Sequence, residues 1–259
     1  MMLTRCTEEV SYNETTDKVT VGWRTSDPFS IKPQETMSFD YIITAVPFTR
    51  VRLWRLPAYS SLLSRAINTL NSDPACKIAL QYKTRFWEHL ENPIFGGCGS
   101  ADIPGIGSIC YPSYKLNSTG PGVLLATYES DVAQARSVGA LSDIDHVALV
   151  QRAMVEVHGS IAEEQFTGNY DRHCWEHDPF EMAAWCSPLA GQQELYLPAY
   201  FRTEFKTVFV GEHTSYTHAW IWSALESAVR GTTQLLLDMG LVDEAKVITE
   251  TWMARWISV

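Results

Sequence analysis

Residues 208–221 read VFVGEHTSYTHAWI, and a stretch with helical spacing, Trp222 to Met239, follows them directly. The first part is an apolar, β-branched run that ends at Gly211 and Glu212. A short polar loop then leads into the apolar periodic stretch, so the pattern predicts a strand, a turn and a helix N-terminus. Such a turn places backbone N–H groups and a carboxylate at the edge of a sheet, where a ligand can bind.

This stretch resembles the C-terminal flavin signature of the flavin-dependent amine oxidases, most closely that of their L-amino-acid oxidase branch of the fungal type. The resemblance implies that Glu212 accepts hydrogen bonds from hydroxyl groups of the cofactor, while the helix N-terminus offers its unpaired N–H groups. An alternative interpretation is that Glu212 only caps the helix. The implied cofactor contacts in this stretch are Gly211, Glu212, Ala219, Trp220, Ile221, Trp222, Ser223 and Ala224, of which Ala219 and Trp220 would also face the substrate.

Composition and charge exclude several classes of protein. The 259 residues are 46% hydrophobic, which is enough for a sizeable core. A net charge of −10 without a basic stripe argues against nucleic-acid binding. The longest apolar runs, such as Tyr41 to Pro47, are far shorter than the roughly 20 residues that span a bilayer. Because the first residues also lack the pattern of a signal peptide, we expect no membrane association and favour a cytoplasmic location.

The cysteines and histidines predict neither disulfides nor a metal site. Cys6, Cys76, Cys98, Cys110, Cys174 and Cys186 show no paired spacing, so reduced thiols are expected. His173 and Cys174 with His177, or His213 with His218, match no closed zinc pattern. The sequence therefore predicts no metal.

Hydrophobic periodicity predicts a mixed α/β chain. Strands are expected at 18–24, 39–47, 75–82 and 122–128, and helices at 59–70 and 142–158, the second opened by Ser142 in the manner of a capping box. Residues 96–112 are rich in glycine and proline, and the pattern predicts a loop there.

A dinucleotide-binding turn of the form G-x-G-x-x-G is absent from the sequence. The pairs at 97–99 and 105–107 lack the third glycine, the preceding strand and the following helix. The resemblance therefore implies the C-terminal portion of a Rossmann-like FAD-binding domain with an inserted sheet-and-helix substrate domain, and a separate or missing N-terminal half. We expect residues 1–56 and 201–259 in the FAD-binding domain and residues 57–200 in the substrate-binding domain.

The chemistry-bearing residues follow from the same resemblance. Cys76-Lys77-Ile78 looks like the family's strand whose lysine reaches N5 of the flavin through a water, which makes Lys77 the catalytic candidate. The alternative is an exposed lysine on a strand edge. Tyr128 stands where L-amino-acid oxidases place the tyrosine that binds the substrate carboxylate, although tyrosines are also common in ordinary strands.

Two tryptophans complete the candidate site. Trp175 begins a segment similar to the family's Trp-x-x-Asp-Pro element and would pack near the flavin, and Trp185 would line the substrate pocket. Ordinary aromatic core is the alternative for both. Because Trp185 holds the place at which monoamine oxidases attach flavin to a cysteine, and Cys186 is displaced by one residue, we expect non-covalent FAD.

The implied reaction is oxidation of an L-amino acid by FAD and oxygen, which yields a 2-oxo acid, ammonia and hydrogen peroxide. Two alternatives stay open: a monoamine or polyamine oxidase of the same family, and an inactive fragment or interaction module that keeps only the fold. The expected partners are the small-molecule substrate, oxygen, an N-terminal half and, as a further possibility, a second copy of the chain.

Overall fold

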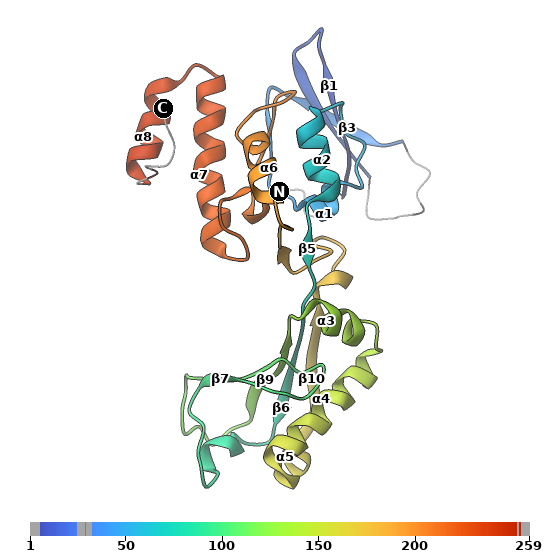
Figure 1. The fold of residues 1–259 in the computed structure, drawn as a ribbon, viewed down its shortest axis with the longest axis vertical. Coiled ribbons are helices and arrows are strands. Elements are labelled where there is room, and N and C mark those ends of the chain that lie inside the picture. Colours follow the sequence, from blue (N-terminus) through green and yellow to red (C-terminus); the bar gives the residue numbers. More distant parts are fainter. Residues whose placement is uncertain (1–5, 25–28, 30–32, 253, 255–259) are drawn as a thin grey trace. The chain divides into compact units, whose positions relative to one another are not determined.

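The computed structural model describes residues 6–24, 29, 33–252 and 254 (Figure 1). The chain forms two compact units, one from Met1–Ser72 and Trp185–Val259, the other from Asp73–Ala184. It passes between them at two short strands, β5 (Ser72–Asp73) and β11 (Trp185–Cys186). The domain limits expected at 56/57 and 200/201 stay a prediction about the family's domains.

The first unit begins with an antiparallel three-stranded sheet, made of β1 (Cys6–Asn13), β2 (Lys18–Arg24) and β3 (Glu35–Phe39). The turn between β1 and β2 forms because the Asn13 side chain accepts hydrogen bonds from the N–H groups of Thr15 and Thr16. Asp17 then adopts a positive φ of 53°. The strand predicted at 18–24 is confirmed.

A parallel pair of strands carries the segment quoted at the outset. β12 (Thr207–Phe209) pairs with β4 (Ile42–Thr44). The strand predicted over 39–47 is therefore shorter, because the last part leads to Pro47, which stands at the N-cap of α1 (Phe48–Val51). Helices α2 (Ser61–Thr69) and α6 (Gln192–Tyr200) supply much of the apolar core around these strands.

Helix α7 (Ile221–Asp238) packs on the end of β12, and α8 (Val242–Thr251) contacts α7 in turn. Gly231 makes the close approach possible, since a Cβ there would lie 2.3 Å from Cγ1 of Val210. Arg230 is 2% exposed, and its Nη2 donates to the Phe209 carbonyl at 2.9 Å and to Oγ1 of Thr214 at 2.8 Å. These bonds fix the helix to the turn η3 (Glu212–Thr214), which follows β12.

The second unit is a five-stranded sheet with the order β10-β6-β9-β8-β7. Helices α3 (Val132–Gly139), α4 (Asp143–His158) and α5 (Ser160–Gln165) lie along it (Figure 1). The Ser142 hydroxyl accepts from the Asp145 N–H, as predicted for the start of α4. The strands are β6 (Cys76–Tyr82), β7 (Gly97–Ser100), β8 (Ser108–Tyr111), β9 (Gly122–Glu129) and β10 (Phe166–Cys174), and short turns lie at η1 (Phe86–His89) and η2 (Trp175–His177).

Two sequence-based expectations about this unit are wrong. Disulfides join Cys76 to Cys174 and Cys98 to Cys110, whereas reduced thiols were expected. The second disulfide crosses β7 and β8, which form an antiparallel hairpin inside the region predicted as loop. Both pairs face each other across strands, and that register is invisible in linear spacings of 98 and 12 residues.

Candidate functional site

Lys77 and Tyr128 lie opposite each other on neighbouring strands of the second unit. They pair in the register of β6 and β9, and Nζ of Lys77 lies 4.6 Å from the centre of the Tyr128 ring. That distance allows a cation–π interaction. Both side chains are half-buried, and β6 is an inner strand, so the alternative of an exposed lysine on a strand edge does not hold. Burial raises the pKa of the Tyr128 hydroxyl, which keeps it a hydrogen-bond donor at neutral pH.

Alternation along β6 explains why Lys77 avoids the core. Cys76, Ile78, Leu80 and Tyr82 are buried, while the residues between them are half-buried on the other face. Trp175 lies at the same end of the sheet, because its N–H donates to the Ala75 carbonyl at 3.0 Å. The ring of Trp175 contacts His173, which pairs with Lys77 in the register of β10 and β6. The fold thus brings Lys77, Tyr128 and Trp175 to one end of this sheet.

Glu212 is held by backbone donors in the first unit. Its Oε1 accepts from the Cys186 N–H at 2.8 Å, and its Oε2 accepts from the Ala219 N–H at 2.9 Å. The N-cap of α7 is Trp220, which lies eight positions further on, so Glu212 does not cap that helix as the alternative interpretation required. Each carboxylate oxygen retains acceptor capacity, because a carboxylate oxygen has more than one lone pair.

The start of α7 is open to a ligand. Within the described part of the chain, no side chain caps this helix at Trp220, and its first turn holds no acidic residue. The Ser223 N–H donates to the Trp220 carbonyl at 3.0 Å, and the positive dipole end of the helix favours an electron-rich ligand. Trp220 and Ile221 are 71% and 82% exposed, and Ala219 has a positive φ of 66°. A residue other than glycine is strained at a positive φ, and such strained residues are typical of functional loops.

Gly211 shapes the turn before Glu212. Its φ is +123°, and a Cβ would lie 2.6 Å from the ring of His213. Its N–H donates to Oγ of Ser227 on α7 at 2.8 Å, which ties the turn to the helix. His213 itself is a core residue: it packs edge-on against Phe48, and burial lowers the pKa of its imidazole to about 3.

One remaining candidate lies in strand β11, and the others lie in the first turn of α7. Trp185 is half-buried in β11, Ser223 is fully buried, Ala224 is half-buried, and Trp222 is 55% exposed. The predicted residues therefore form two groups, one in each unit. The first unit holds Trp185, Gly211, Glu212 and residues 219–224, and the second holds Lys77, Tyr128 and Trp175.

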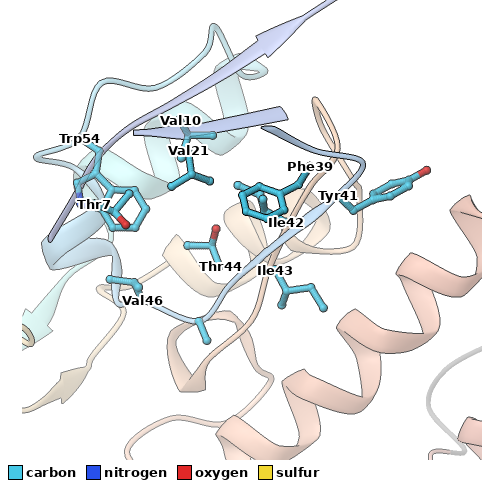
Figure 2. Close-up of a pocket in the computed structure, with 11 residues that line it drawn as sticks. Thr7, Val10, Val21, Phe39, Tyr41, Ile42, Ile43, Thr44, Val46 and Trp54 are labelled. Atoms are coloured by element: carbon cyan, nitrogen blue, oxygen red, sulfur yellow. The ribbon is translucent and has the colours of Figure 1, made fainter. Parts of the chain in front are cut away.

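Sequence reasoning predicted none of the cavities in the structure, of which one adjoins β4 and another adjoins β9. A cavity of about 330 Å³ lies between β4 and the three-stranded sheet, with mainly apolar side chains pointing into it (Figure 2). A second, of about 590 Å³, lies in the second unit and includes Tyr128 together with Asp102, Glu129 and Asp131. Strand alternation marks which residues face a sheet surface, but only the pairing of strands shows which of these surfaces enclose a cavity.

Comparison with known proteins identifies the family. The model of the flavin containing amine oxidoreductases matches residues 3–236, which is most of the chain. The chain therefore belongs to this family.

Individual relatives agree with this assignment. The chain is 50% identical to an L-amino-acid oxidase of Neurospora crassa over 99% of its own length and 38% of the relative's. It is 34% identical to an L-amino-acid oxidase of the fish Siganus canaliculatus over 71% of its length and 35% of the relative's. Each match thus spans less than half of the relative.

Solved structures share the fold. The cyclohexylamine oxidase of Brevibacterium oxydans superposes with a TM-score of 0.66 at 14% identity, over 96% of this chain and 48% of that one. A redesigned putrescine oxidase gives a TM-score of 0.67 at 17% identity, over 95% and 48%. The family implies a flavin cofactor. The available lone pairs of Glu212 and the uncapped N-terminus of α7 are compatible with binding its hydroxyl and carbonyl groups.

Proposed function

We propose that this chain takes part in the oxidative deamination of an L-amino acid to a 2-oxo acid, ammonia and hydrogen peroxide, within a protein that includes further sequence. The observation that carries the proposal is the Lys77–Tyr128 pair on two neighbouring inner strands, in a chain 50% identical to the Neurospora oxidase. The bound cofactor, non-covalent FAD, would accept the hydride from the substrate Cα. Cys186 is buried in the core of its unit, which supports the absence of a covalent link.

The family resemblance suggests a role for each of the chain's own residues. The Tyr128 hydroxyl would donate a hydrogen bond to the substrate carboxylate, and the adjacent Lys77 ammonium adds positive charge that favours the anion. Lys77 would also position the water that hydrolyses the imine product. Trp175 in the second unit, and Trp185 and Trp220 in the first, would each provide an apolar surface that excludes other water, which protects a hydride transfer. Glu212 would accept hydrogen bonds from the cofactor.

One observation favours a second candidate, the oxidation of a simple amine. The cavity that includes Tyr128 also includes Asp102, Glu129 and Asp131. Three acidic residues attract an ammonium group and repel a carboxylate. Solved structures that share this fold include a cyclohexylamine oxidase and a putrescine oxidase, but at this identity they support only the fold.

Tyr128→Phe in the longer enzyme separates the two candidates. Loss of one charge-assisted hydrogen bond should weaken binding of the substrate carboxylate by about 1.5 to 3 kcal/mol. The KM for an L-amino acid should therefore rise roughly tenfold to a hundredfold. The decarboxylated amine lacks the carboxylate and should be unaffected. Peroxide release from matched amino acid and amine pairs measures both. A wild type that prefers the amine, or a variant impaired equally on both substrates, would replace the amino-acid proposal with the amine oxidase.

A further inference from the structure

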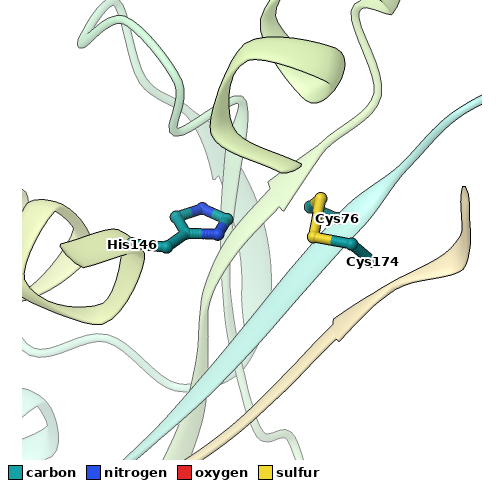
Figure 3. A group of neighbouring side chains, drawn as sticks. All are labelled: Cys76, His146 and Cys174. Atoms are coloured by element: carbon teal, nitrogen blue, oxygen red, sulfur yellow. A yellow bond between two sulfur atoms is a disulfide. The ribbon is translucent and has the colours of Figure 1, made fainter. Parts of the chain in front are cut away.

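The second unit carries two disulfides, and they differ in how far solvent reaches them. Cys76–Cys174 is buried near His146 (Figure 3), and because its sulfurs are bonded to each other, neither offers a thiolate to a metal. Cys98–Cys110 joins β7 to β8, with Cys98 exposed and Cys110 half-buried. Cytosolic reductants keep accessible thiols reduced, whereas disulfides persist in oxidising compartments. The disulfides therefore favour folding in an oxidising compartment over the cytoplasmic location expected from the sequence.

A loop of the same unit carries an acceptor sequence for N-linked glycans. Residues 117–119 read Asn-Ser-Thr and lie between β8 and β9. Such an acceptor needs an asparagine, a hydroxyl two residues later and any residue except proline between them. Asn117 and Thr119 are both exposed, and within the described residues neither side chain makes a hydrogen bond. The two groups that the acceptor requires are therefore free in the folded unit.

The backbone of this loop is held from inside the unit by a buried ion pair. Arg85 and Glu88 are 5% and 4% exposed, and Nε of Arg85 donates to Oε1 of Glu88 at 2.6 Å. The Arg85 guanidinium also donates to the carbonyls of Pro112 and Tyr114, each at 3.1 Å. Oε2 of Glu88 accepts from the Asn117 N–H at 2.7 Å. The ion pair thus fixes the loop through its backbone and leaves the Asn117 side chain exposed.

A positive φ offers a second explanation for the asparagine in this loop. The φ of Asn117 is 57°, and asparagine adopts the left-handed region more readily than most residues do. This conformation does not require Thr119, however. Turn geometry therefore explains the choice of Asn117 but not the complete three-residue pattern.

Exposed apolar side chains precede Asn117 in the same loop. Tyr114 is 68% exposed and Leu116 is 43% exposed. Large apolar side chains that are grouped at the surface commonly mark a site where something covers them. A glycan is bulky and solubilising, so one attached three residues after Tyr114 and one after Leu116 offsets this exposure.

A second sequence of the same type, Asn-Glu-Thr at 13–15, serves as an internal comparison. Oδ1 of Asn13 accepts from the N–H groups of Thr15 and Thr16, at 2.9 and 3.0 Å. These bonds form the turn between β1 and β2, so the turn alone explains an asparagine there. The comparison singles out Asn117, whose side chain has no such role.

We propose that Asn117 is a site of N-linked glycosylation in a protein that folds in an oxidising compartment. The co-reactant is a lipid diphosphate that carries an oligosaccharide. Nδ2 of Asn117 forms a bond to the anomeric carbon of the first sugar and loses one proton. The bond from that carbon to the diphosphate oxygen breaks, and the lipid diphosphate leaves with the electron pair and binds the proton. Nothing is oxidised or reduced, and the proposal does not depend on the proposed oxidase activity.

The test uses the full-length protein that includes this chain, purified from the cells that naturally produce it. Free thiols are alkylated first, and the digested protein is then treated with peptide N-glycosidase in heavy-oxygen water, which converts a glycosylated asparagine to a labelled aspartate. Mass spectrometry should find the label at Asn117 and no alkylation of Cys98 or Cys110. A sample without the glycosidase controls for spontaneous deamidation.

Two variants produced in the same cells separate the acceptor from the turn. Thr119→Ala removes the hydroxyl but keeps Asn117, so the label should be lost. Thr119→Ser keeps a hydroxyl and should retain the label. An unlabelled Asn117 in the wild type, a label only at Asn13, or a label that survives in Thr119→Ala would overturn the proposal. Peroxide release from the same wild-type sample tests the proposed function separately.

Discussion

At the residue scale, positive φ angles mark positions that the sequence alone does not distinguish. Gly211 and Gly191 both lie in the left-handed half of backbone space, with φ of +123° and +81°. Only Gly211 is also crowded, since a Cβ would meet His213 at 2.6 Å, while Gly191 has nothing within 4 Å. Gly191, with ψ of −12°, lies in the left-handed α region, whereas Gly211, with ψ of 164°, lies in a region that essentially only glycine adopts. Gly211 thus combines the greater backbone strain with a steric overlap.

Gly211→Ala should lower the free energy of unfolding by more than Gly191→Ala does. The backbone penalty is about 1–2 kcal/mol at Gly191, in the left-handed α region, and up to about 3 kcal/mol at Gly211, whose φ and ψ are essentially restricted to glycine. The overlap with the buried His213 ring adds about 1–3 kcal/mol at Gly211. Urea denaturation of both variants measures the difference, and equal losses would show that the turn relaxes around the added methyl group.

A second residue-scale prediction concerns His213 and pH. Its pKa is lowered from 6.5 to about 3, because the buried site disfavours the charged ring. The unfolded chain therefore binds a proton below pH 6.5 that the folded chain does not bind until about pH 3. Stability contributed by the neutral ring is complete above pH 6.5 and falls by about 1.4 kcal/mol per pH unit across this window.

The variant His213→Leu removes this proton linkage. The slope of unfolding free energy against pH should be smaller in the variant than in the wild type over the window below pH 6.5. Denaturant titrations at several pH values give both slopes. His146, whose pKa is also lowered, contributes equally to the two proteins and cancels in the difference. Parallel slopes would mean that His213 is solvated in the folded state.

At the scale of elements, the position of α7 depends on the missing side chain of Gly231. A Cβ would lie 2.3 Å from Val210 and 3.3 Å from Val208, so the helix could not approach the strand end as closely. Gly231→Ala should destabilise the fold by about 1–3 kcal/mol, in spite of the better helix propensity of alanine. Thermal unfolding measures the loss. A variant as stable as the wild type would show that the helix shifts without cost.

Elements were predictable where their signal is local. The strand, turn and helix over 207–238 follow from consecutive residues, as does the start of α4 at Ser142. The β7–β8 hairpin was not predictable because its strands are short and rich in glycine, and a disulfide joins them. The cross-strand contact of Lys77 with Tyr128 also escapes the sequence, since a bulge between Ile78 and Ala79 changes the register.

The candidate site shows the same limit. The resemblance assigns Lys77, Tyr128 and Glu212 one by one, but it does not show that Glu212 is held by the N–H groups of Cys186 and Ala219. Those bonds join residues 26 and 7 positions away in sequence. Their formation depends on how β11 and the loop before α7 fold together. The roles of these residues stay predictions.

At the scale of the whole molecule, no helix within the described residues combines the length and the apolar character that a bilayer span requires. The sequence also lacks the phosphate-binding turn of dinucleotide enzymes. We therefore expect the chain alone to bind FAD weakly or not at all. Addition of the sequence by which the relatives are longer should produce a flavin spectrum. Tight, stoichiometric flavin on the chain alone would contradict this prediction.

The division into units has a consequence for how the protein is made. The second unit is one continuous segment, Asp73–Ala184, while the first is assembled from residues on both sides of it. A ribosome therefore finishes the inner unit while the outer one still lacks residues 185–259. At roughly 5–20 residues per second, those residues take on the order of 4 to 15 s to appear. During this interval β4 has no parallel partner, and its unpaired edge is open to pairing with another chain.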